Sequence, residues 1–520
     1  MSPKTRRYCA VLLAATLCLL TVPLFAAPAE TETRPNVIFI LGDDMSYDSV
    51  AALNEKCLIP TPCLDRLISE GMSFSDAHSG SAVCSPTRYG VLTGRYSWRT
   101  SLKRGIVGLW QPPLIDLDRM TVGDMFLENG YDTACIGKWH LGWTWHDAAG
   151  NPTTRAAQVD FTQPVTGGPI EQGFNYYYGD DVPNWPPYVW IENDRTLGIP
   201  SVPKPASMFG TPGPMLPGWS LEAVLPAIME RSVEYIHAQA ETEEPFFLYF
   251  PLTSPHSPIA PSEEFKGKSG ISDYADFVME TDWVVGNILD ALEDTDQAND
   301  TVVIFTCDNG TSRICDFAEL ESHGVDLRNH YRGSKSDAFD GGHRVPFIVR
   351  YPGVVDPNST CDETICLIDF MATAAEILDF ELPVDSAEDS MSLMPLLRGE
   401  TLDAPLHGIV VHHSISGHFA VRKGDWKLLY CRGSGGWTSP TESEAAQANL
   451  PPIQLYNMRT DPKEANNLYE EHPEIVAELT ADLQVLVNAN ASRPDAERSV
   501  PEPSHWGQLP WDEAGDFINK

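Results

Sequence analysis

The chain has 520 residues, of which 42% are hydrophobic, enough to build a large core and a second, smaller domain. Its formal net charge of −38 makes nucleic acid and anionic membranes unfavourable partners, because like charges repel. The sequence contains no long low-complexity tract, so we expect a globular protein.

The first 27 residues have the pattern of a secretory signal peptide. Three basic residues precede an apolar run over residues 10–25, and two alanines follow that run. The run is short for a membrane span, so we expect no stable membrane insertion. The pattern therefore predicts an exported protein, periplasmic or secreted, with residues 1–27 removed.

Apolar runs alternate with amphipathic segments over residues 36–350, which predicts an α/β fold. The alternation indicates a large, mixed and mostly parallel sheet with helices on both faces. Residues 144–220 are rich in glycine, proline and aromatics, and we expect them to form an excursion outside the sheet. Strands are predicted at 36–41, 132–136, 245–251, 301–306 and 345–350, and helices at 61–70, 122–129, 221–240 and 271–293.

The pattern changes near residue 400, where short strand-like runs follow one another without helices between them. These runs predict an antiparallel sheet in a smaller C-terminal α+β subdomain over 400–520, after a catalytic domain over 28–399. The expected strands are 408–412, 419–422, 426–431 and 454–458, and a helix is expected at 473–490.

The cysteines are sparse, and export would permit disulfides among them. Cys57 and Cys63 are close in sequence, as are Cys361 and Cys366, but spacing leaves their connectivity open. Two others, at positions 135 and 307, lie in or beside predicted strands and are expected to be reduced core thiols.

Acidic and amide side chains follow two of the predicted strands. Asp43 and Asp44 come after the first strand, and Asp308 and Asn309 come after the fourth. Ligands of open α/β sheets bind at the carboxyl ends of strands, and an all-oxygen set suits calcium, with magnesium second. A solvated loop is the alternative interpretation of the adjacent aspartates.

Basic and titratable side chains follow the other two strands. Lys138 and His140 come after the strand at 132–136, and in an extended segment residues two apart point the same way. His256 lies between prolines after the strand at 245–251. The alternatives are a surface lysine, a hydrogen-bonded core histidine and a turn histidine.

Cys84 lies at the start of a predicted short helix. Ser85 suits the N-cap, Pro86 the first helical position and Gly94 the end. The amides of such a helix start favour an anion, and Arg88 adds a planar cation at the same end. A nucleophile in an oxyanion site is therefore predicted; a buried cysteine before a surface helix is the alternative.

The string Cys-Ser-Pro-Thr-Arg at 84–88, followed by Leu-Thr-Gly-Arg at 92–95, resembles the signature of the type I sulfatases of the alkaline-phosphatase superfamily. Gly-Lys-Trp-His-Leu-Gly at 137–142 resembles their second signature. Within that family, the chain resembles the branch of arylsulfatase A and N-acetylgalactosamine-6-sulfatase. The resemblance implies that a formylglycine-generating or sulfatase-maturating enzyme oxidises Cys84 to formylglycine, which works as its hydrate.

The resemblance also assigns roles at the site. Formylglycine hydrate would attack sulfur, Arg88, Lys138 and Lys335 would hold the sulfate oxygens, and His256 with Lys335 would protonate the leaving alcohol. His140 would take the proton from the second hydroxyl. The implied calcium ligands are Asp43, Asp44, the modified Cys84, Asp308 and Asn309.

The implied activity is hydrolysis of sulfate esters, on a sulfated small molecule or saccharide. A phosphoester or phosphonate hydrolase of the same superfamily and a non-catalytic sulfated-glycan-binding protein are the alternatives. Tryptophans could stack on sugar rings or merely pack the excursion, and no residue indicates an oligomeric state. Possible substrate contacts are Trp143, Trp145, Trp185, Trp190, Arg195, His323 and Trp437.

Overall fold

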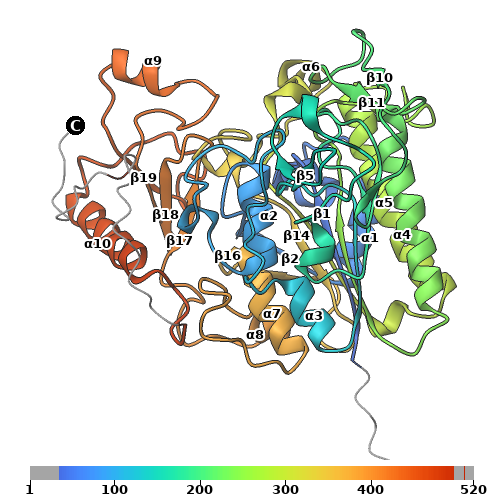
Figure 1. Cartoon of the computed structure of the whole chain (residues 1–520). Coiled ribbons are helices and arrows are strands. Elements are labelled where there is room, and N and C mark those ends of the chain that lie inside the picture. The colour runs from blue at the N-terminus through green and yellow to red at the C-terminus, as the bar shows by residue number, and fades with distance from the viewer. Residues whose placement is uncertain (1–33, 497–508, 510–520) are drawn as a thin grey trace, which may run out of the picture. The chain divides into compact units, whose positions relative to one another are not determined.

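The computed structural model describes residues 34–496 and 509 (Figure 1). The predicted signal peptide lies outside the described residues. Contacts group Arg34–Lys520 into one compact unit, and the boundary at residue 400 stays a prediction. In the described residues, no helix has the length and apolar character needed to span a bilayer.

A ten-stranded mixed sheet forms the centre of the fold, as predicted. Its five middle strands β13, β1, β12, β4 and β7 run parallel, and antiparallel strands flank them on both sides. In spatial order the strands are β15 (Ser359–Cys361), β2 (Met72–Phe74), β14 (Phe347–Arg350), β13 (Thr301–Cys307), β1 (Asn36–Gly42), β12 (Phe246–Pro251), β4 (Asp132–Ile136), β7 (Tyr176–Gly179), β8 (Ile191–Glu192) and β9 (Arg195–Thr196).

Helices form two groups around this sheet (Figure 1). In one group α5 packs against α1 and α4, and in the other α2, α3 and α7 pack together. The β1 strand is buried throughout because its apolar side chains point alternately to both groups; Phe39 meets Phe370 of α7 at 4.2 Å between ring centroids. The helices are α1 (Pro62–Glu70), α2 (Cys84–Thr93), α3 (Val122–Glu128), α4 (Val224–Gln239), α5 (Asp273–Asp294) and α7 (Phe370–Ile377).

The prediction that residues 144–220 lie outside the sheet is wrong in part. Strands β7, β8 and β9 extend the sheet beyond β4, with Cys135 in register with Tyr177. These strands are two to four residues long, too short to show a hydrophobic period. Trp143 and Trp145 are buried in the main core, so neither can stack on a substrate.

The C-terminal antiparallel sheet is confirmed, with the order β17-β18-β19-β20. Each strand starts within two residues of its predicted start, and α10 packs on β18. The elements are β17 (Val410–His413), β18 (Phe419–Lys423), β19 (Trp426–Leu429), β20 (Gln454–Asn457) and α10 (Pro473–Ala489), with α9 (Glu442–Gln447) in a loop that was not predicted as helix.

The first strand of this smaller sheet holds the segment just before α2. The backbone N–H of Ala82 donates to His413 O at 3.0 Å, and Ser81 forms a parallel bridge with His413. The His412 ring donates from Nδ1 to Ser79 O at 3.3 Å. Cys84 therefore follows a segment that the C-terminal sheet fixes in place.

None of the nine cysteines in the described residues forms a disulfide. Cys57, Cys63, Cys361 and Cys366 are all free thiols, so neither close pair is bonded. Cys135 and Cys307 are fully buried, as expected for core thiols, and burial raises their pKa well above the ordinary value.

A buried ion cluster joins the C-terminal sheet to the segment before β14. The Lys427 ammonium donates to Asp340 Oδ1 at 2.6 Å and to Glu464 Oε1 at 2.8 Å, and all three side chains are 0% exposed. Such a cluster depends on its cation, because two buried carboxylates without one repel each other.

Replacing Lys427 with methionine should therefore lower the free energy of unfolding by about 3–5 kcal/mol. Lys423→Met is the control, since Lys423 pairs with Glu478 and Asp482 at the surface and should change stability by less than about 1 kcal/mol. Urea unfolding monitored by tryptophan fluorescence measures both. Equal stabilities of the two variants would contradict the importance of the cluster.

Candidate active site

The carboxyl ends of four neighbouring parallel strands bring the predicted site together. Gly42 of β1 is in register with Cys307 of β13, so the acidic residues that follow these two strands start level with each other. Strand β12 lies next to β1 and β4 lies next to β12, all in the same direction, and β12 and β4 lead to His256 and to Lys138. Sheet order therefore converts four distant segments into one site.

The oxygens after β1 and β13 form a compact buried group. Asn309 donates from Nδ2 to Asp44 Oδ1 at 2.8 Å, and the Asp44 N–H donates to Asp308 Oδ1 at 3.3 Å. Three buried oxygens in this group, Asp43 Oδ1, Asp44 Oδ2 and Asn309 Oδ1, have no hydrogen-bond partner. Ligand atoms of Asp43, Cys84 and Asp308 lie within 4.8 Å of one another. Carboxylate and amide oxygens left unpaired in this way fit a hard divalent cation.

Each carboxylate of the group also has a basic partner. Lys138 Nζ lies 2.5 Å from Asp43 Oδ2, and Lys335 Nζ lies 2.5 Å from Asp44 Oδ1. Arg88 donates to Asp308 Oδ2 from Nε at 3.0 Å and from Nη2 at 2.8 Å. Three cations therefore surround the acidic group, and they can hold an anion that arrives beside it.

The pKa values of the two central aspartates are shifted in opposite directions. Burial alone would raise the pKa of Asp43, but the positive charges of Lys138 and Arg88 outweigh it and hold that pKa below its usual range. Burial, and then the charge of Asp43, raise the pKa of Asp308 well above its usual value. A divalent cation between the two would relieve this repulsion.

The helix that carries Cys84 begins two residues earlier than predicted. Val83 is the N-cap, and Ser85 instead accepts a hydrogen bond at Oγ from Val107 N at 3.1 Å. Pro86 is therefore third in the helix; the predicted Ser85 cap is wrong because extended backbone already ends at Val83. The helix ends as predicted at Gly94, whose φ of 61° suits glycine.

All ten residues of this helix are buried, including Cys84 at 2% exposure and Arg88 at 0%. A helix of this kind is not a surface helix, so that part of the alternative interpretation is wrong, whereas the buried cysteine that it expects is observed. Burial of a guanidinium requires an anionic partner, which here is Asp308.

His140 lies deep in the site in a left-handed backbone conformation, with φ of 56°. Its ring donates from Nε2 to Val107 O at 3.2 Å, while Nδ1 is buried without a partner. Burial, and then the charge of Lys138, lower the pKa of His140 well below its ordinary value. The histidine is therefore neutral and free to accept a proton at Nδ1.

His256 lies at the mouth of the site, with its side chain 13% exposed and Nε2 at 3.9 Å from Asp44 Oδ2. Burial, and then the charge of Lys335, lower its pKa to about 3. An incoming anion would act in the opposite direction, because it stabilises the protonated ring.

Two aspartates escaped the sequence predictions. Asp180 and Asp181 follow β7, which runs parallel to β4, and the Asp181 carboxylate accepts from His140 N at 3.1 Å. Burial, and then the charge of Asp181, raise the pKa of Asp180 to about 7. The signal was available, since a strand followed by two aspartates is also the pattern that located Asp43 and Asp44. Trp185 also lies at the site, edge-on to His140.

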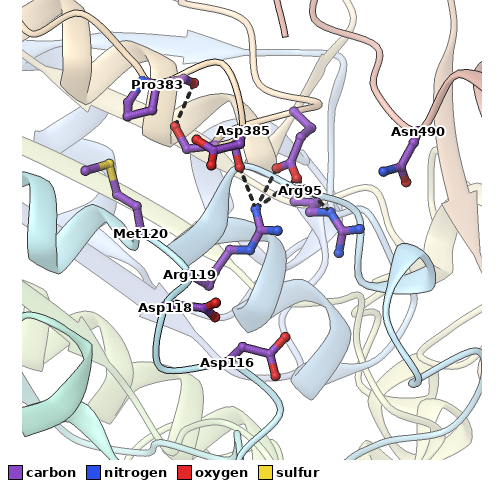
Figure 2. A pocket seen from close by; sticks show the side chains of 10 residues that line it. Arg95, Asp116, Asp118, Arg119, Met120, Pro383, Asp385 and Asn490 are labelled. Carbon is purple, nitrogen blue, oxygen red and sulfur yellow. Dashed lines mark hydrogen bonds and ion pairs between the residues drawn. The ribbon is translucent and has the colours of Figure 1, made fainter. Parts of the chain in front are cut away.

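A separate pocket of about 380 Å³ lies beyond the end of α2 (Figure 2). There Arg119 Nη1 lies 2.9 Å and Arg95 Nε 3.1 Å from Glu388 Oε1. None of the predicted catalytic or metal residues lines this pocket. Arg95 therefore anchors the far end of the helix, although it belongs to the same sequence motif as Cys84.

The fold and site define the class of protein as an enzyme of the alkaline-phosphatase superfamily. The profile of the Sulfatase family matches residues 35–380, and the profile for the C-terminal part of N-sulphoglucosamine sulphohydrolase matches 334–489. The chain belongs to the sulfatase family, and it is a sulfuric ester hydrolase.

Two relatives illustrate the likeness. An N-acetylgalactosamine-6-O-sulfatase of Bacteroides thetaiotaomicron is 30% identical, covering 88% of this chain and 93% of its own. Arylsulfatase A of Bos taurus is 29% identical, covering 90% of each.

Two solved structures share the fold. A sulfatase from a study of glycosaminoglycan metabolism by Bacteroides thetaiotaomicron superposes with a TM-score of 0.74 at 29% identity, covering 87% of this chain and 99% of its own. A phosphonate monoester hydrolase of Agrobacterium radiobacter has a TM-score of 0.55 at 17% identity, covering 87% of this chain and 95% of its own, and shows a shared fold alone.

Proposed function

We propose that this sulfatase removes sulfate from sulfated saccharides, with residue 84 as formylglycine and one calcium ion at the carboxyl ends of β1 and β13. The observation that carries the proposal is the three unpartnered oxygens of Asp43, Asp44 and Asn309, buried beside Cys84 and three basic side chains. Calcium is favoured over magnesium because five protein ligands suit the six to eight oxygens that calcium takes, whereas magnesium usually keeps several waters.

The metal, held by Asp43, Asp44, Asp308, Asn309 and oxidised residue 84, would supply Lewis-acid assistance to the nucleophile. The formylglycine hydrate would supply one hydroxyl that attacks sulfur and a second that lets sulfate leave, which a thiol lacks. The chain itself positions the ester: Arg88, Lys138 and Lys335 provide donors for the sulfate oxygens in a site closed to bulk water.

Proton transfers fall to the two histidines and Lys335. His140 is neutral with an open Nδ1, so it is suited to take the proton of the second hydroxyl. Lys335 carries a proton, because the charge of Asp44 raises its pKa above the ordinary value despite burial. Lys335 and His256, once the sulfate charge has raised the pKa of that ring, would protonate the leaving alcohol.

The saccharide substrate is supported by the similarity to the N-acetylgalactosamine-6-O-sulfatase of Bacteroides thetaiotaomicron. The export pattern of residues 1–27 supports action in the periplasm or outside the cell. A maturating enzyme would have modified residue 84 before the protein arrives there.

A comparison of sulfate and phosphate esters tests the proposal against a phosphoester hydrolase of the same superfamily. We expect the purified enzyme with calcium to hydrolyse an aryl sulfate at least about tenfold faster than the matching aryl phosphate, as its membership of the sulfatase family predicts. A phosphate preference would support the alternative. Glycan binding without turnover, after confirmed modification of residue 84, would support a binding protein.

A further inference from the structure

An exposed tryptophan lies beside the segment that carries Lys335. The Trp437 side chain is 38% exposed, and its backbone N–H donates to Ser336 Oγ and to Asp337 Oδ1, both at 3.0 Å. Lys335 itself reaches Asp44. The C-terminal subdomain therefore places a large aromatic ring at the surface next to a predicted sulfate-binding lysine.

Arg313 lies against the same tryptophan from the other side of the site. Its guanidinium carbon is 5.7 Å from the centroid of the Trp437 ring, and Nη1 donates to Trp437 O at 3.3 Å. Arg313 follows Asn309 closely in the chain, and the intervening Thr311 accepts a hydrogen bond from Lys335 N at 2.9 Å. The pair thus flanks the lysine segment from two separate parts of the fold.

The charge of Arg313 is available to a ligand. In the part of the chain that the structure describes, no carboxylate oxygen lies within 4.0 Å of its nitrogens, although acidic residues outnumber basic ones 73 to 35. Nearby Asp316 accepts from Glu319 N, and Asp337 is occupied by the Trp437 loop. An exposed arginine left unpaired in so acidic a chain is suited to an external anion.

The loop that presents Trp437 is held rigidly. Thr438 donates from Oγ1 to Asp337 Oδ2 at 2.6 Å and from its backbone N–H to Asp337 Oδ1 at 3.2 Å. Gly436 packs so closely that a Cβ there would lie 2.4 Å from Ser336 O. The backbone that presents the ring is therefore fixed before a ligand arrives, which lowers the entropy cost of binding.

We propose that Trp437 and Arg313 form a subsite for the sugar next to the one that loses sulfate, and that this neighbouring sugar bears an oxyanion, either a carboxylate or a sulfate. This proposal rests on the proposed function. The indole face would pack on the apolar face of the sugar ring, and the guanidinium would pair with the oxyanion through two parallel hydrogen bonds.

Three sulfated disaccharides that differ only in the neighbouring sugar test the subsite: one with a uronate, one with a second sulfate and one with a neutral sugar. An aryl sulfate, which fills the sulfate pocket alone, is the fourth substrate. The variants are Arg313→Ala and Trp437→Ala, with Trp437→Phe and Arg398→Ala as controls, since Arg398 pairs with Glu376 at the surface and has no role in the site. Values of kcat/KM are measured at low and high salt.

The wild-type enzyme should prefer at least one anionic neighbour about tenfold over the neutral one, less so at high salt. Arg313→Ala should abolish that preference. Trp437→Ala should lower kcat/KM about tenfold on all three disaccharides, whereas Trp437→Phe should keep most of the wild-type kcat/KM. All variants should hydrolyse the aryl sulfate within about twofold of wild type. The preferred anionic disaccharide identifies the oxyanion as carboxylate or sulfate.

Equal losses on the aryl sulfate and the disaccharides would overturn the subsite, because they would show that the pair only positions Lys335. Disaccharide rates of Arg313→Ala and Trp437→Ala that match those of Arg398→Ala would overturn it as well. Failure of the proposed function looks different, since the wild-type enzyme would then release sulfate from none of the four substrates.

Discussion

Replacing Cys84 with alanine is expected to abolish sulfate release, with a loss of roughly 10⁴-fold or more, because the proposed covalent route loses its nucleophile. The fold should survive, since alanine fits a helix start and Cys84 donates no hydrogen bond to another described residue. Sulfate release from an aryl sulfate and the mass of the peptide around residue 84 are measured together. In the wild type, that peptide should lack the thiol sulfur.

Cys135→Ala is the matched control, since Cys135 is a buried thiol on β4 that is not assigned to the site. It should keep sulfatase activity within a few-fold while lowering stability modestly. Release near the wild-type rate from Cys84→Ala would exclude the assigned nucleophile. An unmodified thiol in a fully active enzyme would exclude formylglycine.

Asp308→Asn is expected to lower calcium content and sulfate release together, the latter by about 100-fold or more. Asparagine keeps the shape of the side chain but removes the charge that binds the ion and pairs with Arg88 at 2.8 Å. Elemental analysis of the dialysed enzyme measures the ion independently of activity. Added calcium should restore part of the activity, and added magnesium less.

Asp282→Asn serves as the control, since Asp282 is also a buried carboxylate but accepts hydrogen bonds from the amides of Cys63 and Leu64 at the start of α1. It should lose stability and keep both calcium and activity. If Asp308→Asn lost activity while its calcium content stayed unchanged, Asp308 would act only by holding Arg88, and its role as a metal ligand would be wrong.

The sequence predicted the regular elements well wherever a hydrophobic period was long enough to read. The fully apolar β1 and β13 and the long α5 are examples. The edge strands β8 and β9 were missed, because two residues carry no period. Their place in the sheet is set by tertiary pairing with β7 and by burial of the aromatic residues around it.

The site was predictable for a different reason. Functional groups directly follow strands, and parallel order brings strand ends together, so adjacency in space could be inferred for Asp43 and Asp308. The contribution of Asp181 depends on β7, and that of Trp437 on contacts between distant loops. The two aspartates after β7 have a local signal in the sequence, but the contacts of Trp437 have none.

The pairing of β17 with the segment before α2 sets an order of assembly. Ser81 bonds His413, which lies 332 residues further along the chain, so this segment cannot be locked until most of the polypeptide has left the ribosome. Until then, part of the protein that surrounds Cys84 is not yet in place. In the folded structure the residue is 2% exposed. The proposed oxidation of residue 84 would therefore take place on the nascent chain, before the pairing of β17 closes the access of another enzyme to that residue.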